Sequence, residues 1–121
     1  MFGFCSCNKE LGSKLESKPN HNLLFFRTKF LEELGSENYL ILEKQLGGKP
    51  KVEYVDDLII VKTLAEINAC GKYVGDVEIK NDSIFLTSKL NSDEICTSTA
   101  IEEFTYIIDN PKRKKYKFKM E

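Results

Sequence analysis

The sequence predicts a mainly β domain with one N-terminal helix, folded as an antiparallel β-meander or a small β-sandwich. Three observations lead to this prediction. Short β-prone segments follow one another, turn signals separate them, and one early segment has helical spacing. The chain has 121 residues, the usual size of one domain. We therefore expect residues 1–21 to form a flexible lead or tether and residues 22–121 to form a single β-rich domain.

The segment 22–34 has the spacing of an amphipathic helix. Its apolar positions are separated by three, four and four residues, at Leu23, Phe26, Phe30 and Leu34. Asn22 is a suitable N-cap and Gly35 a suitable C-terminal stop. An extended segment is the alternative, because the stretch is also rich in β-forming residues. The spacing predicts a helix.

Beyond Gly35 the pattern changes to that of strands. The apolar residues 39–42 lead to a turn signal at 47–50, Gly-Gly-Lys-Pro. Residues 52–55 and 58–61 then flank Asp56 and Asp57, which predicts a hairpin with a tight acidic turn.

Two more hairpins are predicted toward the C-terminus. Residues 77–79 and 84–86 flank Lys-Asn-Asp-Ser at 80–83, where Asn and Asp tolerate tight-turn geometry. The third hairpin pairs 101–108 with 116–120. The last segment alternates strictly, which places Tyr116, Phe118 and Met120 on one face and lysines on the other.

The N-terminus contains a motif that bears on localisation. Residues 4–7, Phe-Cys-Ser-Cys, resemble the lipobox of bacterial lipoproteins. The resemblance implies that Cys7 is lipidated and becomes the first residue of the mature protein. We expect that the true start codon lies upstream or that the chain is a truncated copy of a lipoprotein, with residues 11–22 as the tether. One alternative is a cytosolic N-terminus whose cysteines have no role. Another is a metal site on Cys5 and Cys7, but two thiolates fall short of the four ligands of a structural zinc site, so no metal is expected.

Cys70 and Cys96 are candidates for a disulfide bond. They are 26 positions apart, and each abuts a strand-like segment, so they can face each other across the sheet. In an oxidising compartment we expect a bridge between them, in agreement with the lipobox interpretation. In a cytosolic protein the same pair would be reduced, buried thiols.

The C-terminal region carries the most conspicuous cluster of charge. The chain as a whole has 18 basic and 19 acidic residues, so no overall field favours nucleic acid, and we expect no nucleic-acid partner. The cluster is a candidate patch for an anion or a partner: Lys112, Arg113, Lys114, Lys115, Lys117 and, beyond them, Lys119. The alternative is that these lysines protect a terminal strand from edge-to-edge aggregation.

Catalytic residues are not evident in the sequence. The single histidine, His21, lies beside the linker, where no neighbour orients its ring. The pair Glu102 and Glu103 falls in a predicted strand, where adjacent side chains point to opposite faces. Phosphate-binding glycine patterns are also missing. We expect no enzyme activity and no cofactor.

The favoured function is that of a non-enzymatic small envelope lipoprotein that acts as a structural or binding module. Its expected partner is a protein or an envelope component, with the membrane reached only through the lipid anchor, since the apolar runs are far shorter than the roughly 20 residues of a spanning helix. The alternative is an immunity or antitoxin-type protein that binds and neutralises a bacterial toxin. Without lipidation at Cys7, the chain is expected in the cytoplasm.

Overall fold

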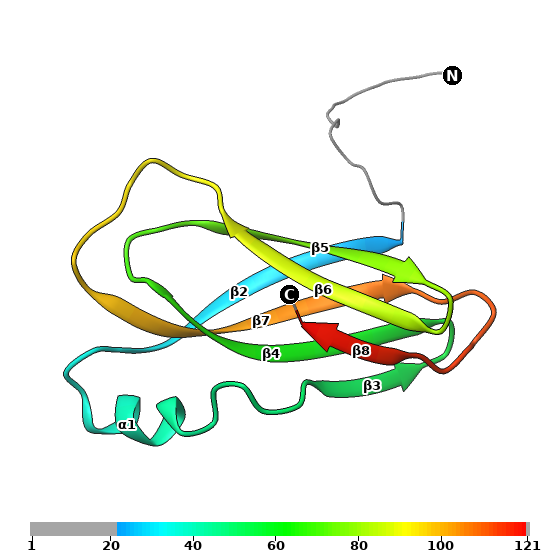
Figure 1. The fold of residues 1–121 in the computed structure, drawn as a ribbon, viewed down its shortest axis with the longest axis horizontal. Coiled ribbons are helices and arrows are strands. Elements are labelled where there is room, and N and C mark those ends of the chain that lie inside the picture. Colours follow the sequence, from blue (N-terminus) through cyan, green and yellow to red (C-terminus); the bar gives the residue numbers. More distant parts are fainter. Residues whose placement is uncertain (1–21, 121) are drawn as a thin grey trace.

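The computed structural model describes residues 22–120, which form two β-sheets and one short helix. The first sheet and the helix involve β2 (Leu23–Glu33), α1 (Glu37–Glu43), β3 (Lys51–Val55), β4 (Leu58–Asn68) and β7 (Thr99–Asp109). The second sheet involves β5 (Tyr73–Lys80), β6 (Ser83–Leu90) and β8 (Lys117–Met120) (Figure 1). The predicted lead 1–21, with Cys7 and His21, lies outside the described residues.

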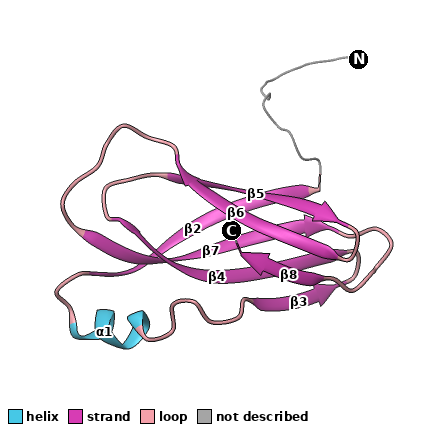
Figure 2. Ribbon diagram, in the orientation of Figure 1, coloured by secondary structure: helices cyan, strands magenta, loops and turns pink. Residues whose placement is uncertain are grey.

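The order of the strands confirms a mostly β protein with two antiparallel-rich sheets (Figure 2). The larger sheet has the order β2-β7-β4-β3 and is antiparallel throughout. In the smaller sheet, β5 pairs antiparallel with β6, and β8 pairs parallel with β6. Neighbours in space are therefore often distant in sequence, unlike in a simple meander.

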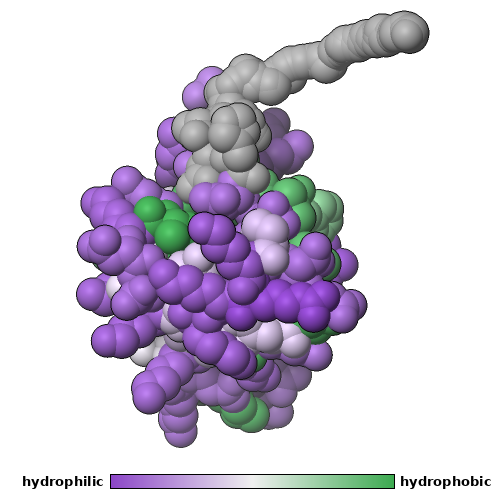
Figure 3. Space-filling view, turned by 90° about the vertical axis from the view of Figure 1, so that its right-hand side faces the viewer, coloured by the Kyte–Doolittle hydropathy of each residue, from purple (hydrophilic) through white to green (hydrophobic). Residues whose placement is uncertain are grey.

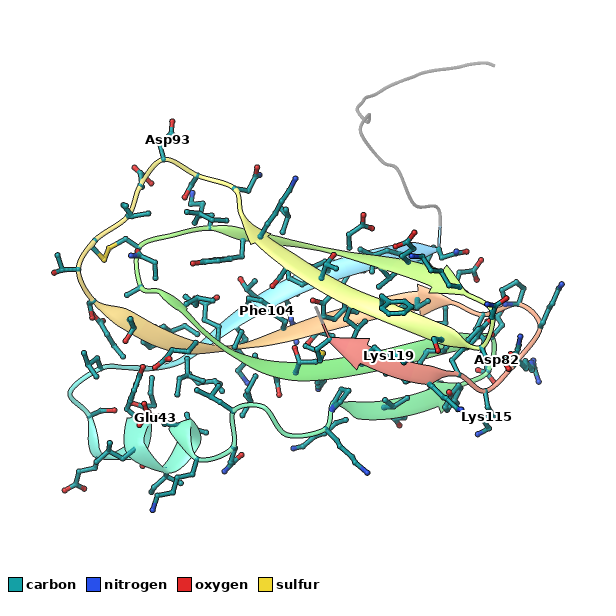
Figure 4. All side chains as sticks on the ribbon, viewed as in Figure 1. Glu43, Asp82, Asp93, Phe104, Lys115 and Lys119 are labelled. Atoms are coloured by element: carbon teal, nitrogen blue, oxygen red, sulfur yellow. A yellow bond between two sulfur atoms is a disulfide. The ribbon has the colours of Figure 1, made fainter. Side chains whose placement is uncertain are left out.

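The core lies between the two sheets. Alternate residues of β4 and β7 point toward the smaller sheet, as the two-residue period of a strand requires. Phe104 lies at the centre of this layer, and the ring of Phe26 contacts it edge-on at 5.3 Å (Figure 4). The hydroxyl of Tyr106 donates a hydrogen bond of 3.0 Å to the carbonyl of Thr87 and so links the sheets. Burial raises the pKa of Tyr106 to about 12, which keeps this hydroxyl a donor.

The helix predicted over 22–34 is wrong, because these residues form the long strand β2. The register of β2 against β7 shifts between Leu23 and Phe25 and again between Phe30 and Glu32. Each shift moves the following side chains to the other face, so the strict alternation of a strand is lost from the sequence. The apolar residues that remain have a helix-like spacing, although the backbone of β2 is paired with β7 along the length of β2.

A helix is found instead where strands were expected to begin. In α1, Ser36 is the N-cap, and its hydroxyl accepts a hydrogen bond of 3.1 Å from the amide of Tyr39. Tyr39 is the only buried residue of α1. Its hydroxyl donates to the carboxylate of Glu66 and also contacts the hydroxyl of Thr99 at 2.9 Å. One buried tyrosine thus anchors the short helix to β4 and β7.

Both predicted hairpins in the middle of the chain are confirmed. Val55 faces Leu58 across the turn of Asp56 and Asp57, and Lys80 faces Ser83 across the second turn. Asp56 and Asn81 adopt positive φ values of 53° and 56°. Such values suit the short polar side chains that the sequence provides at these turns.

The third predicted hairpin is wrong. Both edges of β7 are already occupied, one by β2 and the other by β4. The C-terminal segment therefore crosses to the other sheet, where Phe118 faces Ile84 in a parallel pairing. Its alternation holds in part: Tyr116 and Phe118 pack against the core, whereas Met120 is half-exposed.

Candidate functional site

The basic cluster occupies the connection from β7 to β8 and continues along β8. This connection lies beside the β3–β4 and β5–β6 turns, because the amide of Asn110 donates to the carbonyl of Asp57 and that of Lys117 donates to Asp82. Figure 3 looks onto this end of the molecule and shows a mainly hydrophilic surface. We call this end of the molecule, formed by the β7–β8 connection and the β3–β4 and β5–β6 turns, the basic end. The structure thus brings the candidate residues together at one end.

Asn110 holds the basic connection in a fixed shape. This residue is buried, and its side-chain amide donates to the carbonyl of Lys114 at 3.0 Å while its oxygen accepts from the amide of Lys114 at 3.2 Å. Its carbonyl also accepts from the amide of Arg113, whose φ is 51°. The cationic side chains therefore project from an ordered turn.

Two cations of the β7–β8 connection have defined partners. Lys114 forms an ion pair of 3.0 Å with Asp82, which lowers the pKa of the carboxyl and raises the pKa of the amine through their hydrogen bond. Both side chains are largely exposed, so the pair contributes little to stability. Lys115 lies over the ring of Tyr54 at 4.1 Å from its centroid.

The remaining cations of the connection are open to a ligand. In residues 22–120, the side chains of Lys112 and Arg113 form no ion pair with each other or with any other described residue. Edge protection explains the lysines of β8, which is an edge strand of its sheet. It does not explain Lys112 and Arg113, because these residues precede the strand. The carboxylates of the neighbouring turns, such as Asp57 and Asp82, limit the net positive charge.

Phe85, which was not among the residues predicted for this site, lies near Lys80 and Lys119. It faces away from the core on β6, opposite Lys119 of β8 and Glu78 of β5. The amines of Lys80 and Lys119 each lie 5.5 Å from its ring centroid. The alternation in β6 was a signal for this orientation, because the buried Ile84 and Leu86 flank it.

The disulfide candidates lie at the opposite end of the molecule. Cys70 and Cys96 are joined by a disulfide with a Cα–Cα distance of 5.6 Å, in agreement with the predicted pairing. They do not face each other across the sheet, but join two loops that extend from the neighbouring strands β4 and β7. The side-chain oxygen of Asn68 accepts from the amides of both cysteines at 3.0 Å. One asparagine thus orders both halves of the bridge.

The disulfide end carries negative charge, in contrast to the basic end. Figure 4 shows Glu43 and Asp93 far from Lys115 and Asp82. Further acidic residues lie in α1, near the ends of β2 and β4, and in the β6–β7 loop: Glu32, Glu33, Glu37, Glu66 and Glu94. The small net charge of the chain therefore conceals a separation of charge along its length.

The predicted carboxylate pair lies in β7. Glu102 and Glu103 lie on opposite faces of β7, as predicted, and burial raises the pKa of Glu102. Within residues 22–120, no group of three or more His, Cys, Asp or Glu side chains is arranged to hold a metal ion. No helix of this part is long and apolar enough to span a membrane.

Comparison of the chain with protein-family models, with curated proteins and with solved structures finds no match in any of the three.

Proposed function

We propose that this chain is a small envelope lipoprotein without catalytic activity, anchored through Cys7, whose β domain acts as a binding module. In this arrangement the basic end faces the membrane and the disulfide end is presented to a partner. The proposal combines the lipobox-like residues 4–7 with two features of the described domain.

The disulfide between Cys70 and Cys96 is the observation that carries the proposal. Disulfides persist in secreted and periplasmic proteins and are rare in the cytosol, where thiols are kept reduced. The hydrogen bonds from both cysteine amides to Asn68 hold the two loops together. Such a pre-organised pair favours an oxidised bridge, and therefore an extracytoplasmic location.

The position of the first described residues supports the proposed orientation. Leu23 begins β2 opposite Ile108, and the amide of Asp109 donates to the carbonyl of Asn22. The chain therefore enters the domain at the basic end. A tether from Cys7 would hold Lys112 and Arg113 near anionic headgroups. One acyl chain alone binds a membrane weakly, and a basic patch is a common second signal.

The first test is the intact mass of the protein made from its native locus, measured without reductant after alkylation of free thiols. We expect a chain that begins at an acylated Cys7, with Cys70 and Cys96 unmodified by the alkylating agent. A Cys7→Ser variant should remain unprocessed, whereas a Cys5→Ser variant should mature normally. An unprocessed chain with four alkylated cysteines would contradict the proposal and leave a cytosolic interaction protein, such as the immunity-type alternative.

The second test concerns the orientation of the domain. Replacing Lys112 and Arg113 by glutamate should reduce binding of the lipidated protein to vesicles that contain anionic lipid, because each basic residue near such a surface contributes about 1 kcal/mol. Binding to zwitterionic vesicles should not change. The matched control is glutamate at Lys44 and Lys72, near the disulfide end. Equal losses of vesicle binding for both pairs of substitutions would show that the orientation of the domain plays no part.

A further inference from the structure

A groove lies beside the free edge of β4, away from the basic end. β3 pairs with β4 only as far as Lys51 opposite Lys62, so β4 continues without a partner on that side. The α1–β3 connection passes over this edge. The resulting groove has a volume of about 630 Å³, within the usual range for small-molecule sites. It is lined by both faces of β4, since Lys62, Thr63 and Leu64 are consecutive.

The charged residues of the groove favour an anion. Lys49, Lys51 and Lys62 line it together with a single carboxylate, that of Glu103. Among the described residues, none of these three lysines forms an ion pair. Three amines and one carboxylate leave an excess of positive charge in a concave site, which concentrates anions.

The remaining wall of the groove is mostly apolar. Leu31 comes from β2, Leu42 from α1 and Leu64 from β4, and each is partly exposed to the groove. Met120 of β8 adds a flexible apolar side chain. These residues offer an apolar surface beside the lysines, which is the arrangement expected for a ligand with a charged head and an alkyl chain.

We infer that the groove binds a small amphiphilic carboxylate, whose head contacts Lys49, Lys51 and Lys62. The alkyl chain lies against Leu31, Leu42 and Leu64. This site goes beyond the proposed function and does not depend on it, because none of its residues belongs to the basic connection, the disulfide or the N-terminal motif.

The experiment that tests this inference is a titration of the purified full chain with octanoate, followed by calorimetry and by NMR shifts. We expect octanoate to bind at least tenfold more tightly than acetate, which lacks the chain, and than octanol, which lacks the charge. The shifts should centre on Leu42, Lys62 and Leu64. Equal binding of octanoate and octanol, or no saturable binding of octanoate, would overturn the inference.

Discussion

Removing the disulfide by the double change Cys70→Ala and Cys96→Ala should lower the free energy of unfolding by roughly 3 kcal/mol. The two residues are 26 positions apart, and a cross-link of this span restricts the unfolded chain by about that amount in the chain-entropy account. The bridge also joins the loops that extend from β4 and β7, two paired strands of the larger sheet. Urea unfolding followed by circular dichroism measures the change.

Reductant distinguishes loss of the bond from other effects of the substitutions. Reduction of the wild type should shift the urea midpoint to that of the double variant, whereas the double variant should not respond to reductant. Because Asn68 bonds to backbone groups of both cysteines, the loops should keep part of their order after the bond is lost. A wild type that is insensitive to reductant under unfolding conditions would contradict the expected stabilisation.

The local sequence predicted a helix or strand correctly where a single spacing of apolar residues extends along the whole segment. The first two hairpins were predictable, because Asp56 and Asn81 suit the positive φ values of their turns. β2 was not, since its two register shifts leave apolar residues at helix-like intervals. The partner of the C-terminal strand was not predictable either. That choice depends on β7 having both edges occupied, which is a property of the whole sheet.

The candidate sites also contain some residues that the local sequence reveals and others that only the folded structure reveals. The basic cluster and the disulfide were visible in the sequence, because runs of lysine and the spacing of cysteines are local features. Asn110, which orders the basic connection, and Phe85, whose ring lies near Lys80 and Lys119, were not identified.

Replacing Gly75 by alanine should destabilise the domain by about 1–3 kcal/mol, as expected for overpacking of a tight core. Gly75 lies on β5, and a Cβ atom added there would overlap two ring atoms of Phe26 and lie 2.8 Å from Cε2 of Tyr106. Both rings pack edge-on within the core, with centroids 5.0 Å apart, so neither moves freely. Thermal unfolding of Gly75→Ala measures the loss.

Two further variants identify the cause of that loss. Val74→Ala changes the adjacent residue, which is 39% exposed, and should alter stability by only about 0.5 kcal/mol. Phe26→Leu alone should destabilise the protein, but in combination with Gly75→Ala it relieves the overlap. The two changes together should therefore cost less than the sum of their separate effects. Strict additivity would mean that the sheets separate to admit the methyl group, and that the contact between β5 and Phe26 does not set their spacing.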